Sequence, residues 1–357
     1  MKIGILTYHR THNYGGCLQA LATRLILENM GHEAYYVDYW PNYHKKSYAL
    51  IPLNILWDAP TWKSGIRAFI ESILHLPYSL KRGKNFVHFL NEKIIPFCRP
   101  LSEEYDIIVY GSDQIWRKQI FTNDYNPIYF ANNDFPAKKH IAFSASMGVL
   151  PKEIKEIDRI RELCRNFDKI SVRENDLCEF LREHGFSNTC VTLDPTLLIP
   201  SRMWDDNLRI TNIDGPKYVL FYELNTGTFD IEKVKKFAYE RGLLLKVITS
   251  VANKVDTDTE ITTAGPYEFV KWIRNAEYVF SSSFHGLAFS IIYKKDVFVS
   301  FQANATRAKS LLNIAGISER FIEPGNEIPS LPPIDYEKVE MCLSIHRQFS
   351  FDYLKSI

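Results

Sequence analysis

Short apolar runs alternate with amphipathic stretches along most of the chain. Ile3 to Leu6 is an apolar run of the kind that forms a buried parallel strand. Apolar residues then recur at helical spacing from Leu18 to Ile26, before a natural stop at Gly31. Ala34 to Val37 predicts the next strand. This order of strand, glycine-containing loop, helix and strand predicts a Rossmann-like unit at the start of the chain.

The same alternation continues in two further blocks. In the first block, strands are expected over 106–110, 140–143, 169–172 and 190–193. The chain is then polar and irregular from about 200 to 215, which predicts a crossing between domains. A second alternation starts at 218–222, continues with strands near 243–248, 279–280 and 297–301, and ends in a helix over 336–345.

Two blocks of alternating strands and helices predict an α/β protein with two Rossmann-like domains facing a cleft. The length of 357 residues also favours two domains, because it exceeds what one compact core holds. We expect an N-terminal domain over residues 1–205, a C-terminal domain over 206–335 and a closing helix over 336–357. No GxGxxG fingerprint follows the first strand, so no dinucleotide site is predicted.

A segment from about residue 42 to 100 interrupts the alternation, with helices expected over 67–74 and 84–93. It mixes aromatic and basic side chains, which can rest on a membrane surface or grip a glycolipid. The alternative is a helical insertion packed on the sheet. The residues concerned are Trp57, Trp62, Phe69, Tyr78, Lys81, Arg82, Lys84, Phe86 and Phe89.

Composition excludes several classes of protein. The formal net charge of +1 argues against nucleic-acid binding through bulk charge. The 6 cysteines show no CxxC spacing, so neither a disulfide framework nor a zinc site is expected. No apolar run is long enough to span a bilayer, and no signal peptide precedes Lys2. We therefore expect a cytoplasmic protein.

The stretch from Tyr278 to Tyr293 is the strongest candidate site. A short apolar strand ends in the three serines Ser281 to Ser283, and His285 follows at the start of an apolar helix. The free amides and the positive end of such a helix attract anions, and histidine titrates near neutral pH. The alternative is an N-capped helix with a histidine packed beneath it.

Other polar residues also follow predicted strands. Ser112 and Asp113 follow the strand over 106–110, and Trp116 close behind them could stack a sugar; alternatively the first two only cap the next turn. Arg173 follows the strand over 169–172, and its guanidinium can hold a carboxylate or phosphate with two parallel hydrogen bonds. The alternative for Arg173 is a surface contact with Glu174, its neighbour in the sequence, or a pairing with Asp194.

Several segments together resemble a known family. The sequence Asn275-Ala-Glu-Tyr-Val-Phe-Ser-Ser-Ser-Phe-His-Gly286 is similar to the signature of the polysaccharide pyruvyl transferase family. Segments 8–20, with Asn-Tyr-Gly-Gly-Cys-Leu-Gln, and 105–116, with Gly-Ser-Asp-Gln-Ile-Trp, resemble two more of its motifs, and 171–174 and 193–196 also fit. These matches run in order along most of the chain. The resemblance implies a glycosyltransferase-B-like architecture.

The resemblance also implies a reaction. Members of the family transfer the pyruvyl group of phosphoenolpyruvate to two hydroxyls of a sugar, which gives a cyclic pyruvate ketal and releases phosphate. The expected setting is bacterial surface or capsular polysaccharide biosynthesis, on a sugar or lipid-linked oligosaccharide acceptor. Phosphoenolpyruvate is then a co-substrate, and neither a cofactor nor a catalytic metal is expected. Peripheral contact with the inner face of the plasma membrane is a further expectation.

Roles carry over from the family to matching positions. The resemblance makes His285 the donor-binding proton donor, and Asp113 the base or acceptor ligand. Ser283 stands where arginine occurs in relatives, so Arg173 or Arg307 would have to supply that charge. The expected donor-binding residues are Arg173, Ser283, His285, Arg307 and Lys309. The expected acceptor-binding residues are Asn13, Gln19, Asp113 and Trp116.

Two other functions fit the same sequence features. One is a glycosyltransferase that uses a sugar nucleotide on the same architecture. The other is a non-catalytic carbohydrate-binding protein. Binding of a nucleotide, or binding of sugar without turnover, would distinguish these from pyruvyl transfer.

Overall fold

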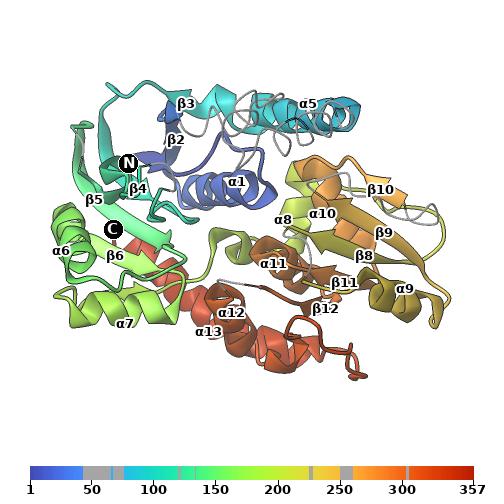
Figure 1. Cartoon of the computed structure of the whole chain (residues 1–357). Coiled ribbons are helices and arrows are strands. Elements are labelled where there is room, and N and C mark those ends of the chain that lie inside the picture. The colour runs from blue at the N-terminus through green and yellow to red at the C-terminus, as the bar shows by residue number, and fades with distance from the viewer. Residues whose placement is uncertain are drawn as a thin grey trace.

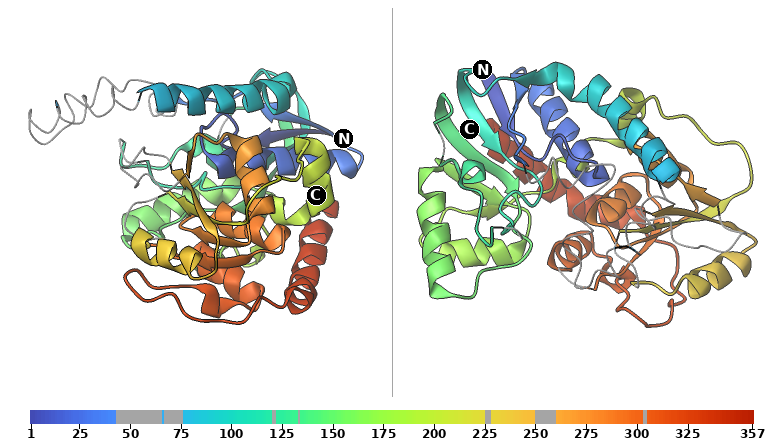
Figure 2. Two further views of the ribbon diagram at one scale, coloured as in Figure 1. Left: turned by 90° about the vertical axis from the view of Figure 1, so that its right-hand side faces the viewer. Right: turned by 45° about the horizontal axis from the view of Figure 1, so that its top comes forward.

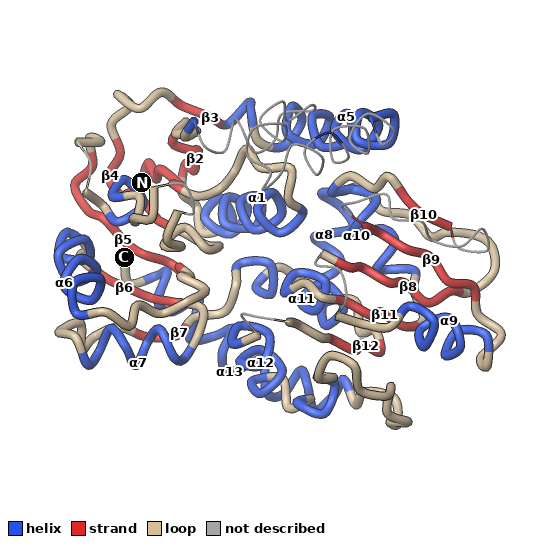
Figure 3. The backbone as a smooth tube through the Cα atoms, in the orientation of Figure 1, coloured by secondary structure: helices blue, strands red, loops and turns tan. Residues whose placement is uncertain are grey.

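The computed structural model describes residues 1–42, 66, 76–119, 122–132, 134–224, 228–249, 260–302 and 305–357. The chain forms two α/β domains that lie side by side, each built around a parallel sheet (Figures 1 and 3). This confirms the predicted fold class of two Rossmann-like domains. The expected helix over 67–74, together with Trp57, Trp62 and Phe69, lies outside the described residues.

The N-terminal sheet has 7 strands in the described part of the chain, in the order β3-β2-β1-β4-β5-β6-β7. Its strands are short apolar runs with helices packed against them, which is why they are buried and parallel. The strands are β1 (Lys2–Leu6), β2 (Glu33–Val37), β3 (Cys98–Arg99), β4 (Tyr105–Tyr110), β5 (Ala137–Ala145), β6 (Lys169–Val172) and β7 (Cys190–Val191). The helices are α1 (Tyr14–Asn29), α5 (Leu76–Lys93), α6 (Ile154–Leu163) and α7 (Asn175–Glu183).

The C-terminal sheet has 5 strands within the described ranges, in the order β10-β9-β8-β11-β12. As in the first sheet, the first strand in the sequence lies inside the sheet, and the order of the strands reverses beside it. The strands are β8 (Tyr218–Glu223), β9 (Leu244–Thr249), β10 (Glu260–Thr262), β11 (Tyr278–Ser281) and β12 (Asp296–Val299). The helices are α8 (Ser201–Leu208), α9 (Ile231–Tyr239), α10 (Pro266–Asn275), α11 (Phe284–Ile292), α12 (Thr306–Ile314) and α13 (Tyr336–Lys355).

The two domains are joined by apolar packing and by the last helix. Tyr14 at the start of α1 stacks on Phe269 of α10 with ring centroids 4.4 Å apart, and its hydroxyl donates to the carbonyl of Ala264. Helix α13 returns to the first domain, where the Tyr353 hydroxyl donates to the carbonyl of Ala142 in β5 (Figures 1 and 2). These contacts hold the carboxyl edges of the two sheets toward one another.

Some element boundaries differ from those expected. The closing helix is longer than 336–345 because its buried positions continue to Leu354. Residues 201–208, expected in an irregular crossing, form α8, whose Trp204 and Leu208 are buried. Helix α5 contains the expected helix over 84–93 but starts earlier, at Leu76. No helix among the described residues is both long and apolar enough to cross a membrane.

Candidate active site

In each parallel sheet the order of the strands reverses beside the first strand, and ligands of open α/β sheets collect at such points. In the N-terminal sheet this point lies between β1 and β4, and in the C-terminal sheet between β8 and β11. The segments that follow β1, β4 and β11 contain Asn13 to Gly16 at the start of α1, Asp113, and His285 at the start of α11. Topology therefore directs the motif residues of both domains to one junction.

His285 of the C-terminal domain is seated on the first turn of α1. It is the second residue of α11, after the N-cap Ser283, and it is buried. A Cβ added at Gly15 would lie 2.0 Å from His285 Nδ1, so the ring packs directly on the α1 backbone. Its other nitrogen, Nε2, lies 3.5 Å from Asp194 Oδ2. The histidine is thus fixed between two elements of the N-terminal domain.

Asp194 is the centre of a buried polar network. Its Oδ1 accepts hydrogen bonds from the backbone nitrogen and hydroxyl of Thr196, at 2.9 and 2.6 Å. Its Oδ2 lies 2.9 Å from Arg173 Nη2. Burial alone would raise the pKa of Asp194, but Arg173, His285 and Thr196 together hold that pKa well below its ordinary value. The carboxylate is therefore ionised at neutral pH.

Arg173 has hydrogen-bond donors that its contacts with Asp194 and Ser112 do not use. Its Nη2 donates to Ser112 Oγ and pairs with Asp194, the pairing that sequence reasoning left open. Its Nε and Nη1 are buried and make no hydrogen bond to the described residues. The guanidinium carbon lies 4.9 Å from the ring centre of Phe284. Two buried nitrogens, which carry three N–H bonds, thus remain for an anionic partner.

Arg307, just inside α12, is a second cation beside the same ring. Its guanidinium carbon lies 5.9 Å from the ring centre of Phe284, and its Nε is buried without a hydrogen bond to the described residues. Burial and the neighbouring Arg173 lower the pKa of Arg307. Two guanidiniums at one ring repel each other, and an anion between them relieves that repulsion. Both guanidiniums lie beside Phe284, the residue after Ser283. This is where a positive charge was expected to replace the arginine that relatives have at position 283.

Glu174 is a buried carboxylate that sequence reasoning treated only as a surface partner of Arg173. Its Oε1 accepts from Ser146 Oγ at 2.8 Å and from the backbone nitrogen of Met147 at 3.1 Å. Burial raises the pKa of Glu174, against the opposing effects of Arg307 and Arg173. The two guanidiniums favour its ionised form, but burial outweighs their effect.

Asp113 lies close to Gly16 of α1, the residue that follows Gly15. Its backbone φ is 74°, in the left-handed region that aspartate tolerates better than most residues. Its Oδ1 accepts from the backbone nitrogen of Gln114 at 2.8 Å. A Cβ added at Gly16 would lie 3.5 Å from Asp113 Oδ2. The two candidate catalytic groups, His285 and Asp113, thus come from opposite domains to consecutive glycines.

Two expected acceptor-side residues instead support the loop after β1. Asn13 is the N-cap of α1, and its side chain accepts from the backbone nitrogen of Gly16 at 3.1 Å. Gln19 is fully buried, and its Nε2 donates to Thr7 Oγ1 and to the carbonyl of Gly16. Gln19 was expected to line an acceptor site, but in the structure its amide lies inside the domain.

Two further residues of the expected site lie away from the Asp194 network. Trp116 cannot stack a sugar here, because it is fully buried, stacks on Phe130 and donates from Nε1 to the carbonyl of Tyr129. Lys309 is exposed and pairs with Glu323 at 3.0 Å, so it does not join the guanidinium pair. The sequence motif around Trp116 covers only neighbouring residues, so it does not predict on which side of the loop the indole packs.

Arg82 of α5 lies at the domain junction rather than on an outer face. Its guanidinium carbon lies 5.5 Å from the ring centre of Tyr14 and 5.1 Å from that of Phe86. Its Nε is buried and unbonded within the described residues. Lys81 and Lys84, in contrast, are exposed. Sequence reasoning grouped these three cations together because it could not tell which side of the helix faces the second domain.

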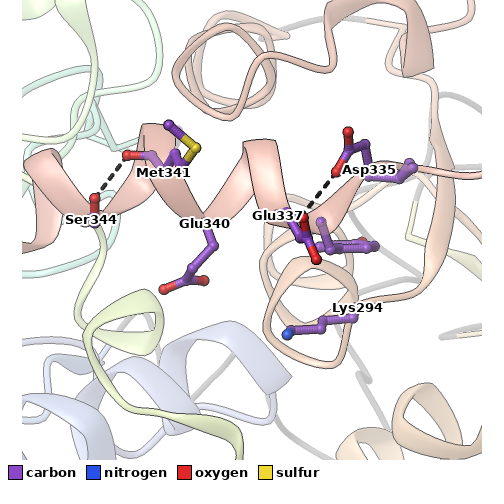
Figure 4. Close-up of a pocket in the computed structure, with 8 residues that line it drawn as sticks. Lys294, Asp335, Glu337, Glu340, Met341 and Ser344 are labelled. Atoms are coloured by element: carbon purple, nitrogen blue, oxygen red, sulfur yellow. Dashed lines mark hydrogen bonds between the residues drawn. The ribbon is translucent and has the colours of Figure 1, made fainter.

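A surface pocket of about 620 Å³ lies at the start of α13 (Figure 4). It is lined by Lys294 after α11 and by acidic and apolar residues of α13, including Glu337, Glu340 and Met341. None of these lining residues belongs to the network around Asp194. Its carboxylates do not suit an anionic ligand, so the Asp194 network is the candidate active site.

Comparisons with known proteins bear on this network. The family model for polysaccharide pyruvyl transferase matches residues 13–299. The comparison with curated proteins gave no match. Among solved structures, the chain is similar to Methanocaldococcus jannaschii UDP-GlcNAc 2-epimerase in complex with UDP-GlcNAc and UDP, with 13% identity over 97% of this chain and 93% of that chain, and a TM-score of 0.47. It is also similar to E. coli heptosyltransferase WaaC with ADP, with 13% identity over 97% of this chain and 100% of that chain, and a TM-score of 0.42.

Proposed function

We propose, from the premise that the chain belongs to the polysaccharide pyruvyl transferase family, that it transfers the pyruvyl group of phosphoenolpyruvate to a sugar. Two hydroxyls of the acceptor become a cyclic pyruvate ketal, in the biosynthesis of a bacterial surface or capsular polysaccharide. The observation that carries this proposal is that Arg173 and Arg307 lie beside Phe284, next to His285, and that all three have buried nitrogens without a hydrogen bond to the described residues.

The two guanidiniums suit the donor. Phosphoenolpyruvate carries a carboxylate and a phosphate on adjacent positions, and each can accept paired hydrogen bonds from a guanidinium. Arg173 is held by Asp194 and Ser112 through Nη2 alone, which leaves Nε and Nη1 for the donor. We assign Arg173 and Arg307 to the donor anions, with Ser283 beside them.

His285 supplies the proton that starts the reaction. Transfer of a proton from the imidazole to the methylene carbon gives C2 of the donor oxocarbenium character. The Asp194 carboxylate, 3.5 Å from Nε2, balances the charge of the protonated ring and orients it. Burial of His285 keeps water from the cationic carbon.

Asp113 receives the proton of an attacking hydroxyl. The first sugar oxygen bonds to C2, the C–O bond to phosphate breaks, and the second sugar oxygen bonds to the same carbon. The methylene gains one proton and phosphate carries away the other, so diol and phosphoenolpyruvate become ketal and phosphate. Asp113 suits this role because its half-buried carboxylate lies next to Gly16, adjacent to the seat of His285.

The outer face of α5 suits a lipid-linked acceptor. Leu80 and Val87 are exposed apolar residues, and Lys81 and Lys84 are exposed cations on the same helix. A helix surface of this composition can rest on anionic lipid. We propose that α5 brings the site to the inner face of the membrane, where a lipid-linked oligosaccharide is presented.

Calorimetric titration tests the donor assignment. Phosphoenolpyruvate should bind the purified protein, whereas UDP-N-acetylglucosamine should not. Arg173→Lys should weaken phosphoenolpyruvate binding, because an ammonium cannot replace a guanidinium that contacts two anions at once. Tight binding of the sugar nucleotide together with indifference to phosphoenolpyruvate would instead select a glycosyltransferase.

A further inference from the structure

Three side chains from separate strands converge at one edge of the N-terminal sheet. His9 lies in the loop after β1, Asp38 directly follows β2, and Cys98 opens β3. These strands are neighbours in the order β3-β2-β1. A nitrogen of His9, a carboxylate oxygen of Asp38 and the sulfur of Cys98 all lie within 4.8 Å of one another. They are the three ligand types that zinc binds most often in proteins.

The hydrogen bonding of His9 fixes the direction of its lone pair. Nδ1 lies 3.0 Å from the carbonyl oxygen of Thr7, and since a carbonyl only accepts, Nδ1 carries the hydrogen. In a neutral ring, Nε2 is then an acceptor. His9 Nε2 makes no hydrogen bond to the described residues, and it lies 3.8 Å from Asp38 Oδ1. The His9 residue is only 1% exposed. The unbonded, buried Nε2 of His9 therefore faces a half-buried carboxylate that also pairs with Arg10, with a thiol close by. A nitrogen, a carboxylate oxygen and a sulfur gathered in this way form a donor set that suits a metal cation.

The geometry points to a divalent transition-metal ion, with zinc the best-suited ion, bound by His9 Nε2, Asp38 Oδ1 and Cys98 Sγ. Imidazole and thiolate together favour zinc over magnesium or calcium. A histidine that donates its other N–H to a backbone carbonyl is the arrangement that orients metal-binding imidazoles. A water molecule would complete a tetrahedron.

Neighbouring groups already hold two of the ligands in place. The His9 ring stacks on Tyr36 with centroids 5.4 Å apart and planes 10° from parallel. The second carboxylate oxygen of Asp38 accepts from Arg10 Nη2 at 2.8 Å, which turns Oδ1 toward His9. A proton on His9 Nε2, shared with Asp38 and Cys98, is the alternative occupant of this cluster. The Co²⁺ titration described below distinguishes a proton from a metal ion.

The ion would tie together the ends of β1, β2 and β3. It would also anchor the loop from His9 to Asn13, which leads into the two glycines under His285 and Asp113. Its role would be structural, since none of its three ligands belongs to the network around Asp194. The sequence hides such a site, because its ligands come from three separate strands and not from one CxxC segment.

Cobalt substitution tests this inference directly. The intact protein would be stripped with a chelator, dialysed and titrated with Co²⁺. We expect saturation at one equivalent, with a near-ultraviolet thiolate-to-cobalt charge-transfer band that Zn²⁺ removes. Cys98→Ser should lose that band. Cys190→Ser is the matched control, because Cys190 is also half-buried and also opens a two-residue edge strand of the same sheet, and it should keep the band.

Thermal melts give a second readout that does not depend on the cysteine. Zn²⁺ should raise the melting temperature of the stripped wild type and of Cys190→Ser, and should leave that of His9→Gln unchanged. The proposal is overturned if stripped wild type shows no thiolate band with Co²⁺, or if the band persists in Cys98→Ser. A zinc-induced shift of equal size in His9→Gln would overturn it as well.

Discussion

His285 Nε2 lies 3.5 Å from Asp194 Oδ2, and this contact links the C-terminal domain to the N-terminal domain. The same carboxylate oxygen lies 2.9 Å from Arg173 Nη2. One buried aspartate therefore positions both the proposed proton donor and the proposed donor-binding guanidinium. Their relative placement depends on how the two domains meet.

Replacement of His285 by asparagine separates chemistry from folding. Asparagine keeps some size and hydrogen bonding but cannot donate a proton near neutral pH. We expect turnover to fall by about two to four orders of magnitude, the usual worth of a positioned general acid, with phosphoenolpyruvate still bound. The comparison holds if thermal melts match wild type, and His184→Asn, at the end of α7, serves as the control. A folded His285→Asn protein with near-normal turnover would leave His285 as a packed, non-catalytic histidine.

Asp194→Asn should be strongly destabilising at neutral pH. It leaves Arg173 buried without its counter-charge, which costs about 3–5 kcal/mol in comparable pairs. Urea unfolding at pH 7 measures this loss. A loss below about 1 kcal/mol would show that the pair is not a structural centre.

The two buried carboxylates Asp194 and Glu174 should change the stability of the protein in opposite directions as the pH changes. The pKa of Asp194 is lowered in the folded state, so its stabilisation is complete above its ordinary value of 3.8 and declines as pH falls below it. The gap in unfolding free energy between wild type and Asp194→Asn should therefore shrink toward acid. The pKa of Glu174 is raised, so its contribution is complete below 4.5 and is lost as pH rises. Relative to wild type, Glu174→Gln should gain stability from pH 4.5 upward, and parallel trends for the two variants would contradict these assignments.

Gly15→Ala tests the seat of His285. The new Cβ would lie 2.0 Å from His285 Nδ1, so the ring must move and turnover should fall by at least about tenfold. In a His285→Ala background the clash disappears, and the alanine should stabilise the helix by about 0.5–1 kcal/mol through its better helix propensity. A double-mutant cycle on unfolding free energy measures this change of sign. Equal effects in the two backgrounds would mean that the ring does not rest on α1.

Vesicle binding tests the role of α5. Lys81→Glu with Lys84→Glu should weaken binding to anionic vesicles by about 1 kcal/mol per cation removed, or more through repulsion. Lys152→Glu with Lys155→Glu, at exposed positions at and near the start of α6, is the charge-matched control. If both pairs bind alike, or if free and lipid-linked sugars turn over equally without vesicle binding, α5 is not a membrane contact.

We expect no catalytic metal. Two guanidiniums and an imidazole at the proposed donor site disfavour a cation, and they can neutralise phosphate without one. Turnover measured below the melting temperature of the stripped protein should survive exhaustive chelation. Loss of turnover that magnesium or manganese restores would contradict this expectation.

The sequence predicted those parts of the site that depend on strand ends. Asp113, Arg173 and His285 each follow a short apolar run, and parallel strands deliver such residues to one edge. It did not predict the central place of Asp194, because that place depends on contacts between domains. It misplaced Trp116 and Gln19 because a local motif does not specify which side chains turn inward. Gly15 gave no signal beyond a paired glycine, since its partner His285 lies 270 residues away.

The most direct test of pyruvyl transfer follows both products in one reaction. The protein is incubated with phosphoenolpyruvate and a panel of lipid-linked oligosaccharides, and phosphate release and acceptor mass are measured on the same samples. We predict one phosphate released for each pyruvyl group gained by the acceptor, with both products formed about two to four orders of magnitude more slowly by His285→Asn. Failure of every acceptor in the panel to gain a pyruvyl group, with no coupled release of phosphate, would contradict the proposed function.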